Sequence, residues 1–205
     1  MLTTSDVAIC PPHERLLRAV AALTRLVSTP ELIGDEVRLV AGADAVMRAL
    51  VRHDDWLHPE MAVPHPQYYR QYLLYGDPLE RFSLVSFVWG PGQATPVHDH
   101  TVWGIIAMLR GAERDQRYRW EGERLVEDGP EHDLLPGHTA LVSPRLSDIH
   151  RVRNAHADQV SISVHLYGAN IGRVQRSVFD PATGTRKPFV SGYSNTLMPN
   201  PWALP

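Results

Sequence analysis

Eight short runs of β-branched, aromatic and aliphatic residues between residues 67 and 168 place the tightest limit on the fold. Gly, Pro and Asp separate these runs at roughly regular intervals, a pattern typical of an all-β barrel or sandwich. The runs are QYYRQYLLY, RFSLVSFVWG, GIIAMLRG, RDQRYRW, ERLVED, HTALVS, IHRVRN and VSISVHLYG. The segment ERDQRYRWEGERLVED within them is most simply a solvent-exposed hairpin.

Both ends of the chain differ from this β-rich centre. Residues 12 to about 52 carry apolar side chains at three- and four-residue spacing and predict helices,. The stretch Ser28-Thr29-Pro30 breaks the first helix, and Asp35 or Asp44 would cap a later one. The last thirty residues, rich in Pro, Gly and Ser, predict an extended tail that wraps the barrel.

Length and composition bound the class of protein. At 205 residues we expect one domain, with residues 1–60 as a helical segment packed on the barrel and residues 61–205 as the barrel and tail,. The net charge of -3 gives no basic surface, so we expect no nucleic-acid partner,. No long apolar run and no secretory signal are present, so we expect no membrane association. Cys10 is the single cysteine, which fits a reducing cytoplasmic setting and leaves metal binding to His, Asp or Glu,.

Two histidines in TPVHDHTVWG, residues 95–104, are the first candidates for a metal site. Alternate residues of a strand point to the same side, so His98 and His100 would aim at one spot. A pair with this spacing is weak evidence by itself in a chain with 11 histidines,. The surrounding residues have to decide between a metal site and chance.

The surrounding spacing resembles the two cupin motifs. Gly92 lies six residues before His98 and Gly111 lies eleven after His100, as in the first motif. PGHTALVSPRLSDIHRVRN resembles the second motif, which ends at His150 and Asn154. The resemblance implies a small cupin (jelly-roll) β-barrel with N-terminal α-helices. It also implies a third histidine ligand, His150, on a distant strand that faces the first pair across the barrel.

Gly104 stands where the usual cupin glutamate ligand would be. The site then has three neutral imidazoles and no carboxylate. Such a ligand set suits Zn, Fe, Cu or Ni, whereas the common iron oxygenase site has two histidines and one carboxylate. Neutral ligands leave the metal ion more positive, which favours an anionic substrate atom such as a thiolate.

HDHT followed by Gly104, then HRVRN and SISVHLYGANI, resembles the thiol dioxygenases over about residues 60–190. These are cysteine dioxygenase and its bacterial relative, 3-mercaptopropionate dioxygenase. The resemblance implies Fe(II) held by His98, His100 and His150, and oxidation of a small thiol carboxylate by O2 to the sulfinic acid. It further implies a catalytic relay, which alternation along one strand would place on a common face. The relay residues are Ser163, His165 and Tyr167.

Two positions favour the 3-mercaptopropionate group. Mammalian-type cysteine dioxygenases carry an arginine for the substrate carboxylate where this chain has Gln71. In the bacterial group an arginine after the tyrosine takes that role, matched here by Arg176, with Arg173 as the alternative. Gly104 also excludes the mammalian-type Cys–Tyr crosslink. The resemblance therefore implies 3-mercaptopropionate as the preferred substrate and cysteine as the closest alternative.

Two interpretations from other classes stay open at this stage. One is a Zn- or Mn-dependent cupin with non-redox chemistry, such as an isomerase or hydrolase. The other is a cupin that binds a ligand without turnover. The sequence gives no oligomeric state.

Overall fold

Two helices precede the strands, as the sequence predicts. The structure is a computed structural model that describes residues 10–146 and 148–200. Helix α2 spans Pro12–Ser28 and helix α3 spans Glu36–Leu50, with the predicted break at the 3-10 turn η1, Pro30–Leu32. No helix in these residues has the length and apolar character needed to span a membrane.

Asp35 caps the second helix. Its side chain accepts a hydrogen bond from the backbone N–H of Arg38 at 3.1 Å, which satisfies one of the free amides at the start of α3,. Asp44, the alternative cap, lies inside α3 instead. There it accepts hydrogen bonds from the side chains of Arg48 and Thr139, and the second of these ties the helix to the barrel.

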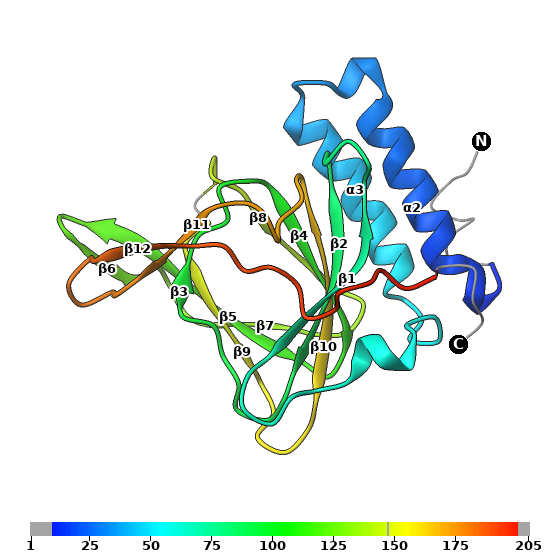
Figure 1. The fold of residues 1–205 in the computed structure, drawn as a ribbon. Helices are drawn as coiled ribbons and strands as arrows, with labels where there is room; N and C mark the ends of the chain where they lie inside the picture. The colour runs from blue at the N-terminus through cyan, green and yellow to red at the C-terminus, as the bar shows by residue number, and fades with distance from the viewer. Residues whose placement is uncertain (1–9, 147, 201–205) are drawn as a thin grey trace.

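Two antiparallel sheets follow the helices and form the barrel (Figure 1). The five-stranded sheet has the order β1-β2-β10-β4-β8, and the seven-stranded sheet has the order β12-β11-β3-β9-β5-β6, with β7 paired to β5. Each sheet draws strands from distant parts of the chain, as in a jelly roll. The predicted cupin barrel with N-terminal helices is confirmed. The strands of the first sheet are β1 (Arg70–Gly76), β2 (Ser83–Trp89), β4 (Gly104–Arg110), β8 (Thr139–Val142) and β10 (Ser161–Tyr167). Those of the second are β3 (Val97–His98), β5 (Glu113–Glu121), β6 (Arg124–Glu127), β7 (His132–Leu134), β9 (His150–Asn154), β11 (Arg176–Phe179) and β12 (Arg186–Phe189).

The five-stranded sheet is buried on both faces at its centre. Every residue of β2 and β10 is buried, and neither strand carries an Asp, Glu, Lys or Arg,. The helices cover the outer face, where Val164 of β10 belongs to the same apolar cluster as Leu23 and Leu50 (Figure 1). Alternation then turns the intervening residues of β10 into the barrel. These interior residues are Ser163, His165 and Tyr167.

The C-terminal segment is more regular than the predicted tail. Its first part forms β11 and β12, which extend the seven-stranded sheet beside β3. The chain then crosses to β1, where Ser194 and Asn195 exchange hydrogen bonds with the backbone of Gln71 and Leu73 (Figure 1). The predicted residues 201–205 of the tail lie outside the described part of the chain.

The β5–β6 hairpin is buried along the first part of β5 and exposed at residues 119–124 and at Glu127. Glu113 and Gln116 of β5 are buried, because the first half of this strand pairs with β9 inside the sheet. Asp115 lies between them and contacts a histidine of the site described below. The prediction of a solvent-exposed hairpin is therefore wrong for residues 113 to 118 and correct for the turn.

Candidate metal centre and active site

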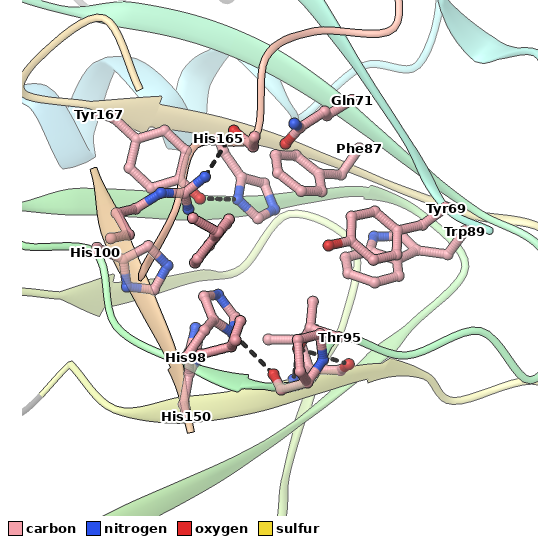
Figure 2. A pocket seen from close by; sticks show the side chains of 16 residues that line it. Tyr69, Gln71, Phe87, Trp89, Thr95, His98, His100, His150, His165 and Tyr167 are labelled. Carbon is pink, nitrogen blue, oxygen red and sulfur yellow. Dashed lines mark hydrogen bonds between the residues drawn. The ribbon is translucent and has the colours of Figure 1, made fainter. Parts of the chain in front are cut away.

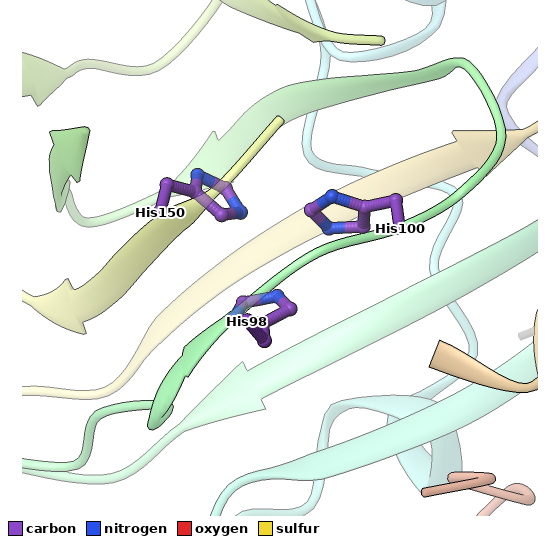
Figure 3. Close-up of side chains that lie close together, drawn as sticks. All are labelled: His98, His100 and His150. Atoms are coloured by element: carbon purple, nitrogen blue, oxygen red, sulfur yellow. The ribbon is translucent and has the colours of Figure 1, made fainter. Parts of the chain in front are cut away.

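Three histidine side chains meet inside the barrel (Figure 3). The ring centroids are 4.8 Å apart for His98 and His100, 4.8 Å for His98 and His150, and 4.9 Å for His100 and His150. One ring nitrogen of each lies within 4.8 Å of the others, and all three residues are buried. A cluster of three imidazole nitrogens this close can bind one transition-metal ion.

Acceptors behind two of the rings fix their orientation. His98 Nδ1 lies 3.1 Å from the carbonyl oxygen of Pro96, and His150 Nδ1 lies 2.6 Å from Oδ1 of Asp115. Since both partners accept hydrogen bonds, each Nδ1 carries the proton and each Nε2 presents a lone pair. The Nε2 atom of His150 is buried and has no hydrogen-bond partner among the described residues. A nitrogen left in that state fits a metal ligand.

Asp115 remains ionised in spite of its burial. Burial by itself would raise the pKa of this carboxyl, but the hydrogen bond from the His150 imidazole, together with the nearby Arg117 guanidinium, outweighs it and holds the pKa below the ordinary value,. A charged acceptor at 2.6 Å makes the His150 imidazole a stronger electron donor,. Asp115 therefore both orients and strengthens one candidate ligand.

A turn, not a strand, positions His100. Strand β3 ends at His98, so the prediction that both histidines alternate on one strand is wrong for His100. Oδ2 of Asp148 accepts hydrogen bonds from the backbone N–H groups of His100 at 2.8 Å and Thr101 at 3.1 Å. Thr101 has φ of 60°, in the left-handed region, and this bend returns the chain toward the barrel,. The turn brings the two rings together without strand geometry.

His150 lies beside His98, not across the barrel from it. The two residues are directly paired between the antiparallel neighbours β3 and β9. Side chains in such a pair project from the same face and touch. The predicted placement on a facing strand is therefore wrong, because β3 and β9 belong to one sheet. The strand that faces the histidines is β10.

Strand β10 carries a hydrogen-bonded row of three side chains. Ser163 Oγ lies 2.8 Å from His165 Nε2, and His165 Nδ1 lies 2.8 Å from Tyr167 Oη. The Tyr167 ring stacks on the candidate ligand His100 with centroids 5.6 Å apart, so one end of the row reaches the histidine cluster (Figure 2). The structure thus brings the predicted relay residues and the predicted metal ligands into one site.

Burial keeps the groups of this site neutral. It lowers the pKa values of His98, His100 and His165 well below the ordinary value for histidine. It also raises the pKa of the Tyr167 phenol above its ordinary value. Unprotonated imidazoles can bind a metal ion, and a protonated phenol can donate a hydrogen bond.

Gly104 makes room for Tyr167. A Cβ atom at this position would lie 2.7 Å from Cδ1 of Tyr167 and 3.0 Å from Cγ2 of Val142, closer than normal packing allows. The tyrosine ring therefore occupies the space that a side chain at position 104 would need. A glutamate ligand there and this tyrosine exclude each other.

A cavity of about 200 Å³ adjoins the histidine cluster. Figure 2 shows the histidines at one end of this cavity and Tyr69 and Trp89 at the other. No Asp or Glu occurs among its lining residues in the described part of the chain. The lining residues are Tyr69, Gln71, Phe87, Trp89, Thr95, Pro96, His98, His100, His150, Val152, His165, Tyr167, Arg176, Val178, Phe189 and Ser191.

Arg176 contributes a buried positive charge to the cavity. It is 4% exposed, its Nη2 donates to Ser191 Oγ at 2.7 Å, and its guanidinium lies 4.7 Å from the ring centre of Phe189. Its Nε is buried without a partner, and no carboxylate forms an ion pair with it among the described residues. Burial lowers the pKa of Arg176 and outweighs the opposing effects of nearby groups such as Asp99,.

The other two substrate-binding candidates lie in different surroundings. Gln71 lines the cavity, but its Nε2 already donates to the carbonyl oxygen of Gly192 at 2.8 Å and so fastens the C-terminal segment to β1. Arg173 lies at the surface with 76% of its side chain exposed, and it pairs with Glu80 at 2.9 Å. The structure brings Arg176, and not Arg173, into the cavity.

Four residues near the site were not predicted from the sequence, because little in the sequence indicates their positions. Asp115 and Glu113 alternate on β5 and therefore face the interior together, but the charged segment around them suggested exposure. Asp148 precedes His150 by two residues, and only the fold brings it to the turn at His100. Tyr69 reaches the cavity from just before β1 and stacks on Phe87 and Trp89.

The fold and the site together define a cupin barrel with a candidate metal centre of three histidines. A hydrogen-bonded row that ends at Tyr167 lies beside this centre, and Arg176 places a positive charge in the cavity wall. The family model for cysteine dioxygenase type I matches residues 43–179, and the chain belongs to this family. The protein is thus a thiol dioxygenase. All eight predicted site residues fall inside the matched range.

Individual relatives agree with this assignment. Cysteine dioxygenase type 1 of Homo sapiens is 27% identical over 154 residues, which cover 74% of each chain. The protein of the same name from Danio rerio is 26% identical over 108 residues, which cover 51% of this chain and 52% of its own. Among solved structures, a protein with a double-stranded beta-helix domain from Klebsiella pneumoniae subsp. pneumoniae matches with a TM-score of 0.43 at 17% identity, over 55% of this chain and 87% of its own.

Proposed function

We propose that this thiol dioxygenase uses Fe(II) and O2 to convert a small thiol carboxylate, preferably 3-mercaptopropionate, to its sulfinic acid. The observation that carries the proposal is the pairing of two features in one cavity. Three buried neutral histidines converge at one end, and the unpaired guanidinium of Arg176 lies in the same cavity wall. A small molecule with a soft anionic atom and a carboxylate would satisfy both.

The donor set fits iron. His98, His100 and His150 would hold the ion through nitrogen atoms, and the unpartnered Nε2 of His150 supports this assignment. Imidazole nitrogen suits first-row metals from iron to zinc, so the residues alone do not select among them. Bound Fe(II) would supply the capacity to bind a thiolate and O2 and to exchange electrons with both.

Arg176 would bind and orient the substrate carboxylate. Its guanidinium, whose Nε has no hydrogen-bond partner among the described residues, can form a bidentate pair with a carboxylate, which fixes orientation as well as position,. The Phe189 ring and Ser191 hold the guanidinium from behind, so it needs little reorganisation when the anion arrives,. With the carboxylate fixed at this wall, the thiol would extend toward the histidines.

Tyr167 would supply a hydrogen-bond donor next to the reacting sulfur. Its hydroxyl is held by His165, and its ring by the stack on His100. The raised pKa of the phenol keeps its proton in place at neutral pH. The C-terminal segment covers the cavity through Phe189 and Ser191 and would exclude bulk water during the reaction,.

The lining of the cavity favours 3-mercaptopropionate over cysteine. A volume of about 200 Å³ suits a molecule smaller than ordinary drug-sized ligands,. No lining carboxylate is available for an ammonium group, and Gln71 offers only a neutral amide. Cysteine is the closest alternative, since relatives such as the protein from Homo sapiens bear that substrate in their names.

An oxygen electrode tests the proposal directly. Protein freed of metal is loaded anaerobically with Fe(II) or with Zn(II), and O2 uptake is followed with 3-mercaptopropionate, cysteine, cysteamine and mercaptosuccinate. We expect uptake only with Fe(II), and the highest kcat/KM for 3-mercaptopropionate, with the sulfinic acid as product. Equal efficiency on cysteine would overturn the substrate preference alone. Equal uptake with Zn(II), or none with any thiol, would overturn the iron dioxygenase.

A further inference from the structure

Glu113 is a buried acid with no role in the function proposed above. The residue is 1% exposed, and neither carboxylate oxygen completes a hydrogen bond within the described part of the chain. The hydroxyl of Ser163 and the indole N–H of Trp89 lie beside this carboxyl, close enough to lower its pKa. Ser163 is the far end of the row on β10, so Glu113 stands at the end opposite to Tyr167.

The surroundings of Glu113 favour the neutral acid. Burial is the largest influence on its pKa, outweighs the opposing effects of Ser163 and Trp89 and, with a small contribution from the charge of Asp115, raises the pKa to about 8. The residues paired with it in the sheet are neutral, Leu134 on β7 and Asn154 on β9. A carboxylic acid in this setting carries one donor and one acceptor.

A neutral Glu113 determines which group is the donor in each hydrogen bond along the row. Its O–H can donate to Ser163 Oγ, and the Ser163 hydroxyl then donates to Nε2 of His165. Nδ1–H of His165 must in turn donate to Tyr167 Oη, which leaves the Tyr167 hydroxyl free to donate into the cavity. The indole N–H of Trp89, 3.3 Å from Ser163 Oγ, supports the same direction, because it too makes Ser163 an acceptor on this side.

We propose that Glu113 is the fourth member of this row and acts as a positioning residue that sets the direction of its hydrogen bonds. When Glu113 is protonated, Tyr167 donates to the cavity. When it is ionised, Ser163 donates to the carboxylate, Nε2–H of His165 donates to Ser163, and Nδ1 accepts from Tyr167. The hydroxyl of Tyr167 is then turned away from the cavity.

The reversal of the hydrogen bonds transfers one proton along the row and releases one proton into the cavity. Glu113 passes its proton to Ser163, Ser163 passes one to Nε2, Nδ1 passes one to Tyr167, and Tyr167 releases one into the cavity. His165 holds a single proton before and after, first on Nδ1 and then on Nε2. No oxidant, reductant or further reactant is required. The effect on turnover rests on the proposed function, whereas the tautomer of His165 does not.

Nitrogen NMR of His165 tests the proposal without turnover. The full-length protein is labelled with 15N-histidine and loaded with Zn(II), a diamagnetic ion, and His165 is assigned from the signals lost in His165→Asn. The spectra are recorded from pH 6 to pH 10 for the wild type, Glu113→Gln and Glu113→Leu. Glu127→Gln, an exposed residue of β6, is the matched control.

We expect wild type and Glu127→Gln to change from Nδ1–H to Nε2–H near pH 8, and both Glu113 variants to show no such change. Glu113→Gln should keep Nδ1–H throughout, because its amide can give a hydrogen bond to Ser163 and accept one from Trp89. A single tautomer in the wild type, or an equal change in Glu113→Leu, would overturn the proposal.

Turnover provides the second readout. With Fe(II) and 3-mercaptopropionate, kcat of the wild type should fall about tenfold for each pH unit above the transition, and kcat of Glu113→Gln should lack this fall. Parallel pH profiles would overturn the link between the row and turnover. Absence of turnover in every form would count against the proposed function, and the NMR result would still decide the role of Glu113.

Discussion

Replacement of Arg176 by alanine gives the sharpest test of how the cavity selects its substrate. The guanidinium is 4% exposed and has no anionic partner among the described residues, so a substrate carboxylate would complete its hydrogen bonding. Loss of this group should weaken the use of thiols that carry a carboxylate. Cysteamine has no carboxylate and should be affected little.

The size of the effect follows from burial and geometry. A hydrogen bond to a charged group contributes about 1.5–3 kcal/mol, and a buried bidentate pair belongs to the upper part of that range. We therefore expect Arg176→Ala to lower kcat/KM for 3-mercaptopropionate roughly 30- to 150-fold, mainly through KM. Arg176→Lys keeps the charge without the fork and should recover only part of the loss.

Arg173→Ala is the matched control for this experiment. Arg173 lies three residues away in sequence, but it is exposed at the surface and paired with Glu80. Steady-state O2 uptake is measured for the wild type and both variants on 3-mercaptopropionate and on cysteamine. A loss of equal size on both thiols in Arg176→Ala would mean that the arginine supports the fold instead of the carboxylate. A large selective loss in Arg173→Ala would refute the assignment of the carboxylate site.

Four further outcomes follow from the same geometry. His150→Ala should lose most bound iron while the barrel still folds, as measured by metal analysis and circular dichroism. The reason is that the described lining residues include no carboxylate that could replace the lost ligand. Asp115→Ala should weaken metal affinity about 10- to 100-fold in a chelator competition, since it removes the acceptor at 2.6 Å from Nδ1 of His150,. Gly104→Ala should lower the unfolding free energy by about 1–3 kcal/mol in urea, because the new Cβ would overlap Tyr167,. Stability should also depend on pH through Glu113, whose pKa is raised from 4.5 in the unfolded chain to about 8. The folded state binds more protons between these values, so this residue's contribution to stability falls as pH rises through that window, by about 2 kcal/mol from pH 6 to pH 8, and urea unfolding of Glu113→Gln should lack this slope.

The fold could be predicted because its signals are local. The apolar spacing of residues 12–52 and the break before Pro30 give the helices, and the short β-rich runs give the barrel. The tail was harder to predict, because β11 is stabilised by pairing with β3 and the edge strand β12 by pairing with β11. Pairing partners of that kind are set by the tertiary fold, which composition does not report.

The site, like the fold, has a part that could be predicted from the sequence and a part that could not. The spacing around His98 and His100, and the alternation of Ser163, His165 and Tyr167, identified groups that the fold does bring together. The sheet that contains His150 could not be predicted, because it depends on which strands become neighbours. Supporting residues such as Asp115 and Asp148 were missed for a related reason. Each contacts a histidine many residues away, and a single carboxylate in a charged segment carries no sign of that contact.

The charges around the cavity explain why such a site would discriminate against an ammonium group. Three neutral ligands leave the full charge of a metal ion in place, and Arg176 adds another positive charge. Asp115 and Asp148 lie behind the histidines, are already occupied with them and do not line the cavity.

A thiolate with a carboxylate neutralises both positive centres. The ammonium of cysteine sits beside its own carboxylate and would therefore lie roughly 5 Å from the guanidinium that binds it, where repulsion costs about 3 kcal/mol at an effective dielectric constant of about 20. That energy corresponds to about a hundredfold in kcat/KM. Selectivity in this cavity would then come less from a contact made with 3-mercaptopropionate than from the lack, among the described lining residues, of an acid that could accept the cysteine ammonium.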